Sequence, residues 1–152
     1  MKVEYINPFV RAAGEVLERE LNCVIEQGTV SLCRSAYTTH DVTVLVGVTG
    51  DIQGLVLYGL AEEAACAMAA VILGQDVSEL DDLAQSGIAE LGNSITAAAG
   101  VYLEEAGYHS TMTPPTLLLG KGTMISTIDL PRLVVPITCE LGALDIHIAL
   151  HS

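Results

Sequence analysis

The sequence has no tryptophan, a single phenylalanine, and only 6 lysine and arginine residues against 19 acidic ones. The net charge of −13 repels phosphate backbones and anionic lipid headgroups, so we expect neither nucleic acid nor a membrane surface as a partner. With so few aromatic residues, the core has to be built from aliphatic side chains. Apolar residues make up 51% of the 152 residues and charged ones only 16%, an excess that burial at a subunit interface would explain.

The sequence also lacks a long apolar run and a paired cysteine motif. Its longest apolar stretch, residues 64–73, is half of what a membrane-spanning helix needs, and the N-terminus does not resemble a signal peptide. Cys23, Cys33, Cys66 and Cys139 are scattered and form no CxxC pair. Isolated cysteines of this kind are typical of reduced, buried thiols. We therefore expect a cytoplasmic protein.

No metal-ligand spacing is visible in the chain. His40, His109, His147 and His151 are isolated, and the last two lie four residues apart on an expected strand, which separates them too far for one small ion. We expect exposed strand histidines and no metal or other cofactor of the protein's own.

Residues 120–123, Gly-Lys-Gly-Thr, resemble a phosphate-binding loop only superficially. That loop needs a glycine separated by four residues from Gly-Lys-Ser/Thr, and a helix after it. Here Pro115 stands in the place of the first glycine, Gly122 replaces the hydroxyl residue, and strands are expected to follow. The pattern predicts a turn between two strands.

The apolar periodicity predicts one domain over residues 1–152. Helices are expected at 7–22, starting from Asn7-Pro8, at 61–73, and from a capping Ser78 to Gly107. Strands are expected within 23–34 and at 41–49, 52–60, 116–119, 125–128, 132–140 and 143–151. Helices come singly and strands come in hairpins. This order predicts an α+β fold, a largely antiparallel sheet packed with two to three helices.

The long helix carries a polar pair away from its expected apolar stripe. The residues of that stripe are Leu80, Ala84, Gly87, Leu91, Ile95, Ala98 and Tyr102. A second band, about 130° round the helix, holds Ser86, Glu90, Asn93 and Ala97. A carboxylate and a carboxamide three residues apart lie side by side on a helix, and the small Ala89 and Ala97 would let another surface approach them.

These residues carry a resemblance to a known family. The segments 5–9 (Tyr-Ile-Asn-Pro-Phe) and 48–54 (Val-Thr-Gly-Asp-Ile-Gln-Gly), and the motif Ser86-x-x-x-Glu90-x-x-Asn93 with a downstream proline, resemble the CheX branch of the CheC/CheX/FliY family. Members of this family are phosphatases of the chemotaxis response regulator. The resemblance covers essentially the whole chain, and the helix motif is its signature.

The resemblance implies an activity and roles for the motif residues. The substrate would be the aspartyl phosphate of a CheY-like receiver domain, with Asn93 orienting the hydrolytic water and Glu90 pairing with a cation of the receiver. Ser86, Ala89 and Ala97 would complete the partner-binding face. Mg²⁺ is expected in the receiver and not in this protein.

The resemblance also implies the assembly. CheC members carry two such helices, whereas here Glu15-Val16-Leu17-Glu18 stands where a second motif would lie. One site per chain resembles CheX, whose members are described as dimers that pair through their sheets. The aliphatic excess and a chain that ends on a regular strand also favour a homodimer.

Two other interpretations stay open from the sequence. A non-catalytic dimeric adaptor could bind a receiver or a flagellar switch component through the same helix without hydrolysis. A purely structural dimerisation domain could carry Glu90 and Asn93 as solvated surface residues.

Overall fold

The computed structural model describes residues 3–34, 37–125 and 131–152. Its helices are α1 (Val3–Leu21), α2 (Glu62–Leu73) and α3 (Asp82–Glu105). Its strands are β1 (Glu26–Gln27), β2 (Ser31–Cys33), β3 (Tyr37–Thr38), β4 (Val42–Gly50), β5 (Gln53–Leu60), β6 (Ser110–Met112), β7 (Thr116–Leu119), β8 (Met124–Ile125), β9 (Arg132–Cys139) and β10 (Gly142–His151). The α+β class is confirmed. No helix in the described residues has the length and apolarity to span a membrane.

The main sheet is antiparallel at every pairing between described strands. Its order is β1-β9-β10-β5-β4-β6, with β2 also pairing with β9 and β7 with β4. The two expected hairpins, β4–β5 and β9–β10, are confirmed. The chain ends on β10, which lies between β9 and β5 and is therefore not a sheet edge open to pairing with a second chain. The edges are instead short strands, of 2 to 4 residues.

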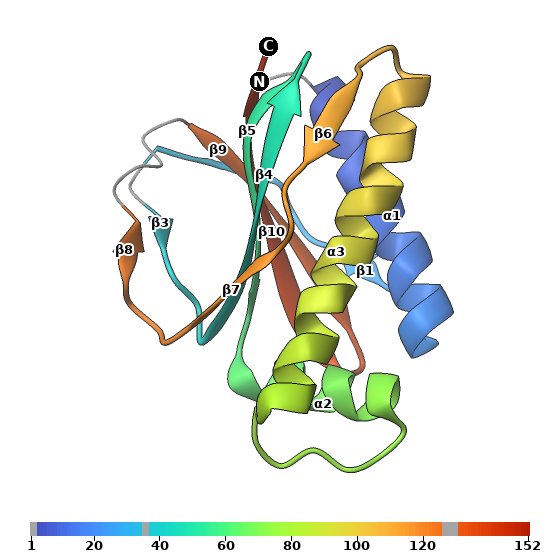
Figure 1. Ribbon diagram of the computed structural model, residues 1–152, viewed down its shortest axis with the longest axis vertical. Coiled ribbons are helices and arrows are strands. Elements are labelled where there is room, and N and C mark those ends of the chain that lie inside the picture. The colour runs from blue at the N-terminus through green and yellow to red at the C-terminus, as the bar shows by residue number, and fades with distance from the viewer. Residues whose placement is uncertain (1–2, 35–36, 126–130) are drawn as a thin grey trace.

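All three helices lie on one side of the sheet, and the small β3–β8 ribbon lies on the other (Figure 1). Alternate residues of the strands face the helices because side chains alternate along a strand. Their buried apolar members are Val42, Val44, Val46, Val48, Val56, Tyr58, Leu60, Val135, Ile137, Leu144, Ile146, Ile148 and Leu150. The core is therefore mainly aliphatic, as the composition predicts, although Tyr5, Phe9 and Tyr58 are also fully buried in it. α1 and α3 pack along each other across this face.

Two helix starts differ from the expected ones. α1 begins at Val3 and continues through Pro8, whose ring removes only the hydrogen bond to the Glu4 carbonyl near the start of the helix. Tyr5 and Ile6 are buried, and their packing accounts for the extra turn. α3 begins at Asp82, capped by Asp81 and not by Ser78.

The structure also differs from the expected one in its short strands. β3 and β6 were not expected, because two or three residues are too few to show a period. The strand expected at 125–128 is described only at its start, in β8, and residues 126–128 lie outside the described residues.

Candidate functional site

The motif helix α3 is held at both ends by local capping. The Asp81 carboxylate accepts a hydrogen bond from the Ala84 amide at 2.9 Å, which satisfies one of the free N–H groups of the first turn. At the other end Gly107 adopts a positive φ of 97°, a conformation that favours glycine. The 24 residues of Asp82–Glu105 form one continuous helix without a lysine or arginine.

A close contact at the middle of α3 fixes the helix on the sheet. A Cβ atom on Gly92 would stand 2.8 Å from Cγ1 of Val44 in β4, so the helix can lie this near only with glycine there. Thr96 donates to the Gly92 carbonyl at 2.8 Å and pairs with the Tyr58 hydroxyl at 2.7 Å. Burial raises the pKa of Tyr58 well above its ordinary value, so its hydroxyl stays protonated.

This packing places the buried stripe of α3 differently from the expected one. Its buried residues are Ala84, Ile88, Leu91, Gly92, Ile95, Thr96, Ala99 and Leu103. Four residues that were expected inside are only half-buried: Leu80, which precedes the helix, Gly87, Ala98 and Tyr102. The stripe lies further round the helix because α3 packs against both the sheet and α1.

The polar pair lies opposite that stripe, as the sequence predicts. Glu90 is exposed and Asn93 is half-buried. Within the part of the chain that the structure describes, neither side chain has a hydrogen-bond or ion-pair partner. Both groups are therefore available to a molecule that approaches α3 from solvent.

The neighbouring predicted contact residues lie on the same side of α3. Ser86 and Ala97 are exposed, and Ala89 is half-buried. The Ser86 hydroxyl donates to the Asp82 carbonyl of its own helix at 3.0 Å. This occupied hydroxyl is no candidate nucleophile, in agreement with the sequence.

A hollow of about 120 Å³ adjoins one side of Glu90. Its wall combines Glu90 and Ser94 of α3 with Glu20 of α1 and Ile72 of α2. No sequence pattern predicts Glu20 at this place, because its position depends on how α1 and α2 pack against α3.

In the segment of α1 where a second motif would lie, the Glu15 side chain already has partners within the fold. Glu15 accepts hydrogen bonds from the Tyr102 hydroxyl and from Arg11. The Arg11 guanidinium also stacks over the Tyr102 ring, 3.9 Å from its centroid. These contacts join α1 to α3, so Glu15 serves the packing of the two helices.

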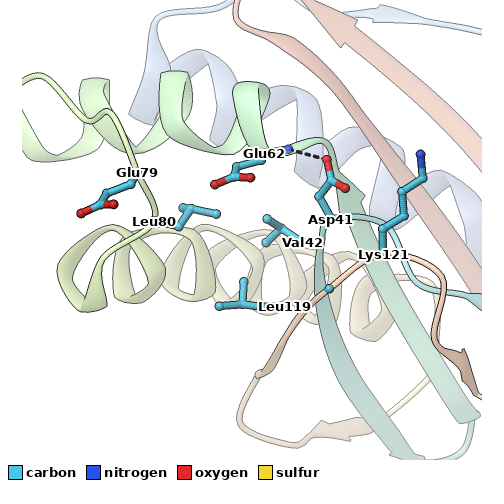
Figure 2. Close-up of a pocket in the computed structure, with 8 residues that line it drawn as sticks. Asp41, Val42, Glu62, Glu79, Leu80, Leu119 and Lys121 are labelled. Carbon is cyan, nitrogen blue, oxygen red and sulfur yellow. Dashed lines mark hydrogen bonds between the residues drawn. The ribbon is translucent and has the colours of Figure 1, made fainter.

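A separate pocket of about 330 Å³ lies beside the start of α2 (Figure 2). Asp41, Glu62 and Glu79 contribute carboxylates to it, and the Asp41 carboxylate accepts the Glu62 amide at 3.0 Å. Lys121 extends away from these carboxylates in Figure 2. The negative charge of these carboxylates disfavours the binding of phosphate in the pocket.

The glycine-rich residues 120–123 form a turn between β7 and β8, which confirms the expectation. The amides of Gly120 and Gly122 donate to the carbonyls of Asp41 and Thr39, each at 3.0 Å. The Thr123 amide donates to the Thr39 hydroxyl at 2.9 Å. These three N–H groups are used within the fold, so the turn does not offer them to a phosphate.

His109 and His151 are exposed as expected, whereas His40 is half-buried and His147 is buried. His147 was expected to be exposed, but it is 7% exposed on the sheet face away from the helices. His40, Asp145 and His147 offer ligand atoms within 4.8 Å of one another, a group that spacing along one element could not reveal. Arg132 already donates to His147 Nδ1 at 3.3 Å, so a guanidinium supplies positive charge where a metal ion would have to bind. Burial, with lesser effects of His40 and Arg132, lowers the pKa of His147 to about 4.

The four cysteines are free thiols, as predicted, but only Cys23 is buried, and the expectation of burial is wrong for Cys33, Cys66 and Cys139, which are half-buried. Burial and the neighbouring Cys139 thiol raise the pKa of Cys23 to about 11. Burial also raises the pKa of Cys66. The thiols of Cys23 and Cys66 therefore stay protonated at neutral pH and are poor nucleophiles.

Comparison with known proteins identifies the family. Residues 42–138, which include the whole of α3, match the family model described as "Chemotaxis phosphatase CheX". The chain belongs to this CheX family. The resemblance inferred from the sequence is confirmed.

Relatives of this CheX-family protein match over its full length. The CheY-P phosphatase CheX of Thermotoga maritima is 27% identical over 154 residues, covering 100% of this chain and 99% of the relative. A CheC-like superfamily protein from Shewanella sp. PV-4 has a TM-score of 0.89 at 25% identity, with 100% of both chains covered. A chain in the CheX–CheY–BeF3–Mg²⁺ complex from Borrelia burgdorferi has a TM-score of 0.83 at 25% identity, covering 99% of this chain and 100% of the other.

Proposed function

We propose that this CheX-family protein hydrolyses the aspartyl phosphate of a CheY-like receiver domain. The observation that carries the proposal is the pair formed by Glu90 and Asn93, which lies on the solvent side of α3 without partners among the described residues. The name of the Thermotoga maritima relative, a CheY-P phosphatase, supports the substrate class. The Borrelia burgdorferi structure, in which CheX is in complex with CheY, supports a CheY-like protein as the partner.

The reaction requires no covalent bond between this protein and the phosphoryl group. A water oxygen attacks phosphorus, the bond to the aspartyl oxygen breaks, and the receiver regains its carboxylate as inorganic phosphate leaves. The Asn93 amide oxygen can accept a hydrogen bond from that water while its NH₂ group donates to an oxygen nearby. An amide is too weak a base to remove the proton. The role of Asn93 is therefore to position the water.

Glu90 acts in docking. Its exposed carboxylate can pair with the lysine of a receiver's phosphorylation site, which brings Asn93 up to the phosphoryl group. Mg²⁺ belongs to the receiver in this scheme, and this protein supplies no ligand to it. A chain with a net charge of −13 requires such cationic groups on its partner, since two acidic surfaces otherwise repel.

The residues near the Glu90–Asn93 pair are small enough to allow a receiver domain to come close to it. Ala89 and Ala97 project only a methyl group, and the Ser86 hydroxyl is bonded to its own helix. A loop of the receiver can therefore come close to Asn93 without displacing long side chains. We assign these three residues to the partner-binding face.

The same proposal includes a homodimer in the cytoplasm, where the thiols stay reduced. Val30 and Leu32, near the β2 edge, are 37% and 50% exposed, and pairing there would bury them under two-fold symmetry. α3 lies toward the opposite side of the sheet, near β4, β6 and β7. A dimer through β2 would leave both α3 faces open.

The test is phosphate release from phosphorylated CheY-like receivers of the same organism. Wild-type protein should accelerate release, and Asn93→Ala should lower kcat on the order of 10²-fold with little change in folding, by analogy with losing one preorganised polar group. Asn7→Ala, an exposed asparagine of α1, is the matched control. Binding without any acceleration would identify an adaptor, and neither binding nor acceleration would identify a structural domain.

A further inference from the structure

The solvent side of α3 carries two large apolar side chains that no neighbour covers. Leu83 is 54% exposed and Val101 is 55% exposed. They are the exposed large apolar residues of α3 in the described structure. Leaving such side chains in water forgoes the free energy of burying them.

Both side chains lie on the face of the Glu90–Asn93 pair. Leu83 precedes Glu90 by seven residues and Val101 follows it by eleven, which are two and three helical turns. At 3.6 residues per turn, each projects within about 20° of the direction of Glu90. The active pair is therefore flanked, along one line of the helix, by an apolar side chain at each end.

We propose that Leu83 and Val101 are the two apolar anchors of the receiver, which lies along the whole exposed face of α3. This inference rests on the proposed function. From Leu83 to Val101 the helix rises about 27 Å, close to the diameter of a small domain. One receiver domain can thus contact both anchors while its phosphorylation site lies between them.

Charge favours the receiver over a second copy of this chain as the occupant. α3 has no basic residue, and its exposed face carries the carboxylates of Glu90 and Glu104. Two such faces from identical chains of net charge −13 would repel each other. A partner with a cationic group at its centre and apolar surface on either side matches the pattern.

The experiment separates docking from chemistry. Leu83→Ser, Val101→Ser and the double variant are compared with wild type in kcat and KM for the phosphorylated receiver. Equilibrium binding to the same receiver, activated with beryllofluoride and Mg²⁺, is measured by calorimetry. Val24→Ser and Val71→Ser, exposed valines outside α3 at 84% and 43% exposure, are the matched controls.

Each anchor variant should raise KM and Kd about three- to tenfold, as expected for a half-exposed aliphatic side chain that is no longer buried. The value of kcat should stay within about twofold, because Asn93 is untouched. The double variant should show the product of the two effects, since anchors about 27 Å apart act independently.

Two results would overturn the inference. Wild-type KM and Kd in Val101→Ser would show that the receiver does not reach the second half of α3. A change in light-scattering mass with unaltered receiver affinity would assign the face to the dimer. If wild type binds the activated receiver but releases no phosphate, the proposed hydrolysis fails, while the binding measurements still decide the role of the anchors.

Discussion

Gly92 of α3 and Val44 of β4 touch so closely that a single added methyl group would clash. The Cβ of an alanine at position 92 would stand 2.8 Å from Val44 Cγ1 and 3.3 Å from its Cβ. Val44 is β-branched and has little rotamer freedom with which to move aside. This contact sets the distance between the helix and the sheet at the residue before Asn93, so the position of the proposed water-orienting group depends on it.

Gly92→Ala should destabilise the protein by about 1–2 kcal/mol, because overpacking outweighs the gain in helix propensity. Gly87→Ala in the same helix is the control. Its added Cβ would lie 3.7 Å from Ile72 Cγ2, an ordinary contact, so propensity should stabilise it by about 0.5–1 kcal/mol. Urea unfolding measures both. Equal shifts in the two variants would contradict the close contact.

Removing the Thr96 hydroxyl should lower the free energy of unfolding more than removing the Tyr58 hydroxyl. Thr96 gives its single proton to the Gly92 carbonyl, so Tyr58 must be the donor between the two hydroxyls. Thr96→Val leaves a buried donor without an acceptor and should cost about 1–3 kcal/mol, against about 1 kcal/mol for Tyr58→Phe. Denaturant unfolding of the single and double variants gives the coupling. A larger cost for Tyr58→Phe would reverse the assigned donor.

Glu90→Gln should raise KM about tenfold and reduce the salt dependence of receiver binding, since it removes a charge from a docking pair. Glu63→Gln, an exposed glutamate of α2, changes the net charge equally and should leave KM unaltered. The measurement is KM at low and high ionic strength. Identical salt slopes for wild type and Glu90→Gln would argue against an ion pair.

Acid should destabilise the fold through His147. Its pKa is about 4 in the folded protein, against an ordinary value of 6.5. The unfolded chain therefore binds more protons between these values, and stability is fully present above about pH 6.5 and is lost as the pH falls toward 4. The shift corresponds to at most about 3 kcal/mol.

The free energy of unfolding measured from pH 4 to 7 checks this effect. His147→Gln should flatten the slope in that window. His109→Gln, which changes a ring whose side chain is 77% exposed, should leave the slope as in wild type. A wild-type slope in His147→Gln would show that another group titrates there.

Light scattering should give about twice the chain mass of 16.0 kDa. Leu32→Lys should yield monomers, because a charge at the β2 edge opposes pairing. Leu119→Lys places a charge on a residue of equal exposure, 50%, at the opposite edge and should preserve the dimer. Dissociation by Leu119→Lys alone would assign the interface to β7.

The sequence alone determined the features that depend on short-range periodicity. The alternating valines of 42–48 predicted the strand that faces the helices, and Gly74 correctly marked the end of α2. Glu90 and Asn93 were placed away from the core because the direction of a helical side chain follows from its spacing. The family motif lies within one continuous helix, which is why it could be read without a structure.

Only the tertiary structure decided which distant segments meet. It placed β10 in the middle of the sheet and brought Glu20 beside Glu90. It also brought together His40, Asp145 and His147, the last of which accepts a hydrogen bond from Arg132. The pairing of strands and the packing of helices set these contacts, and neither leaves a fixed spacing in the chain. The requirement for glycine at position 92 has the same origin, since it depends on how near α3 lies to Val44.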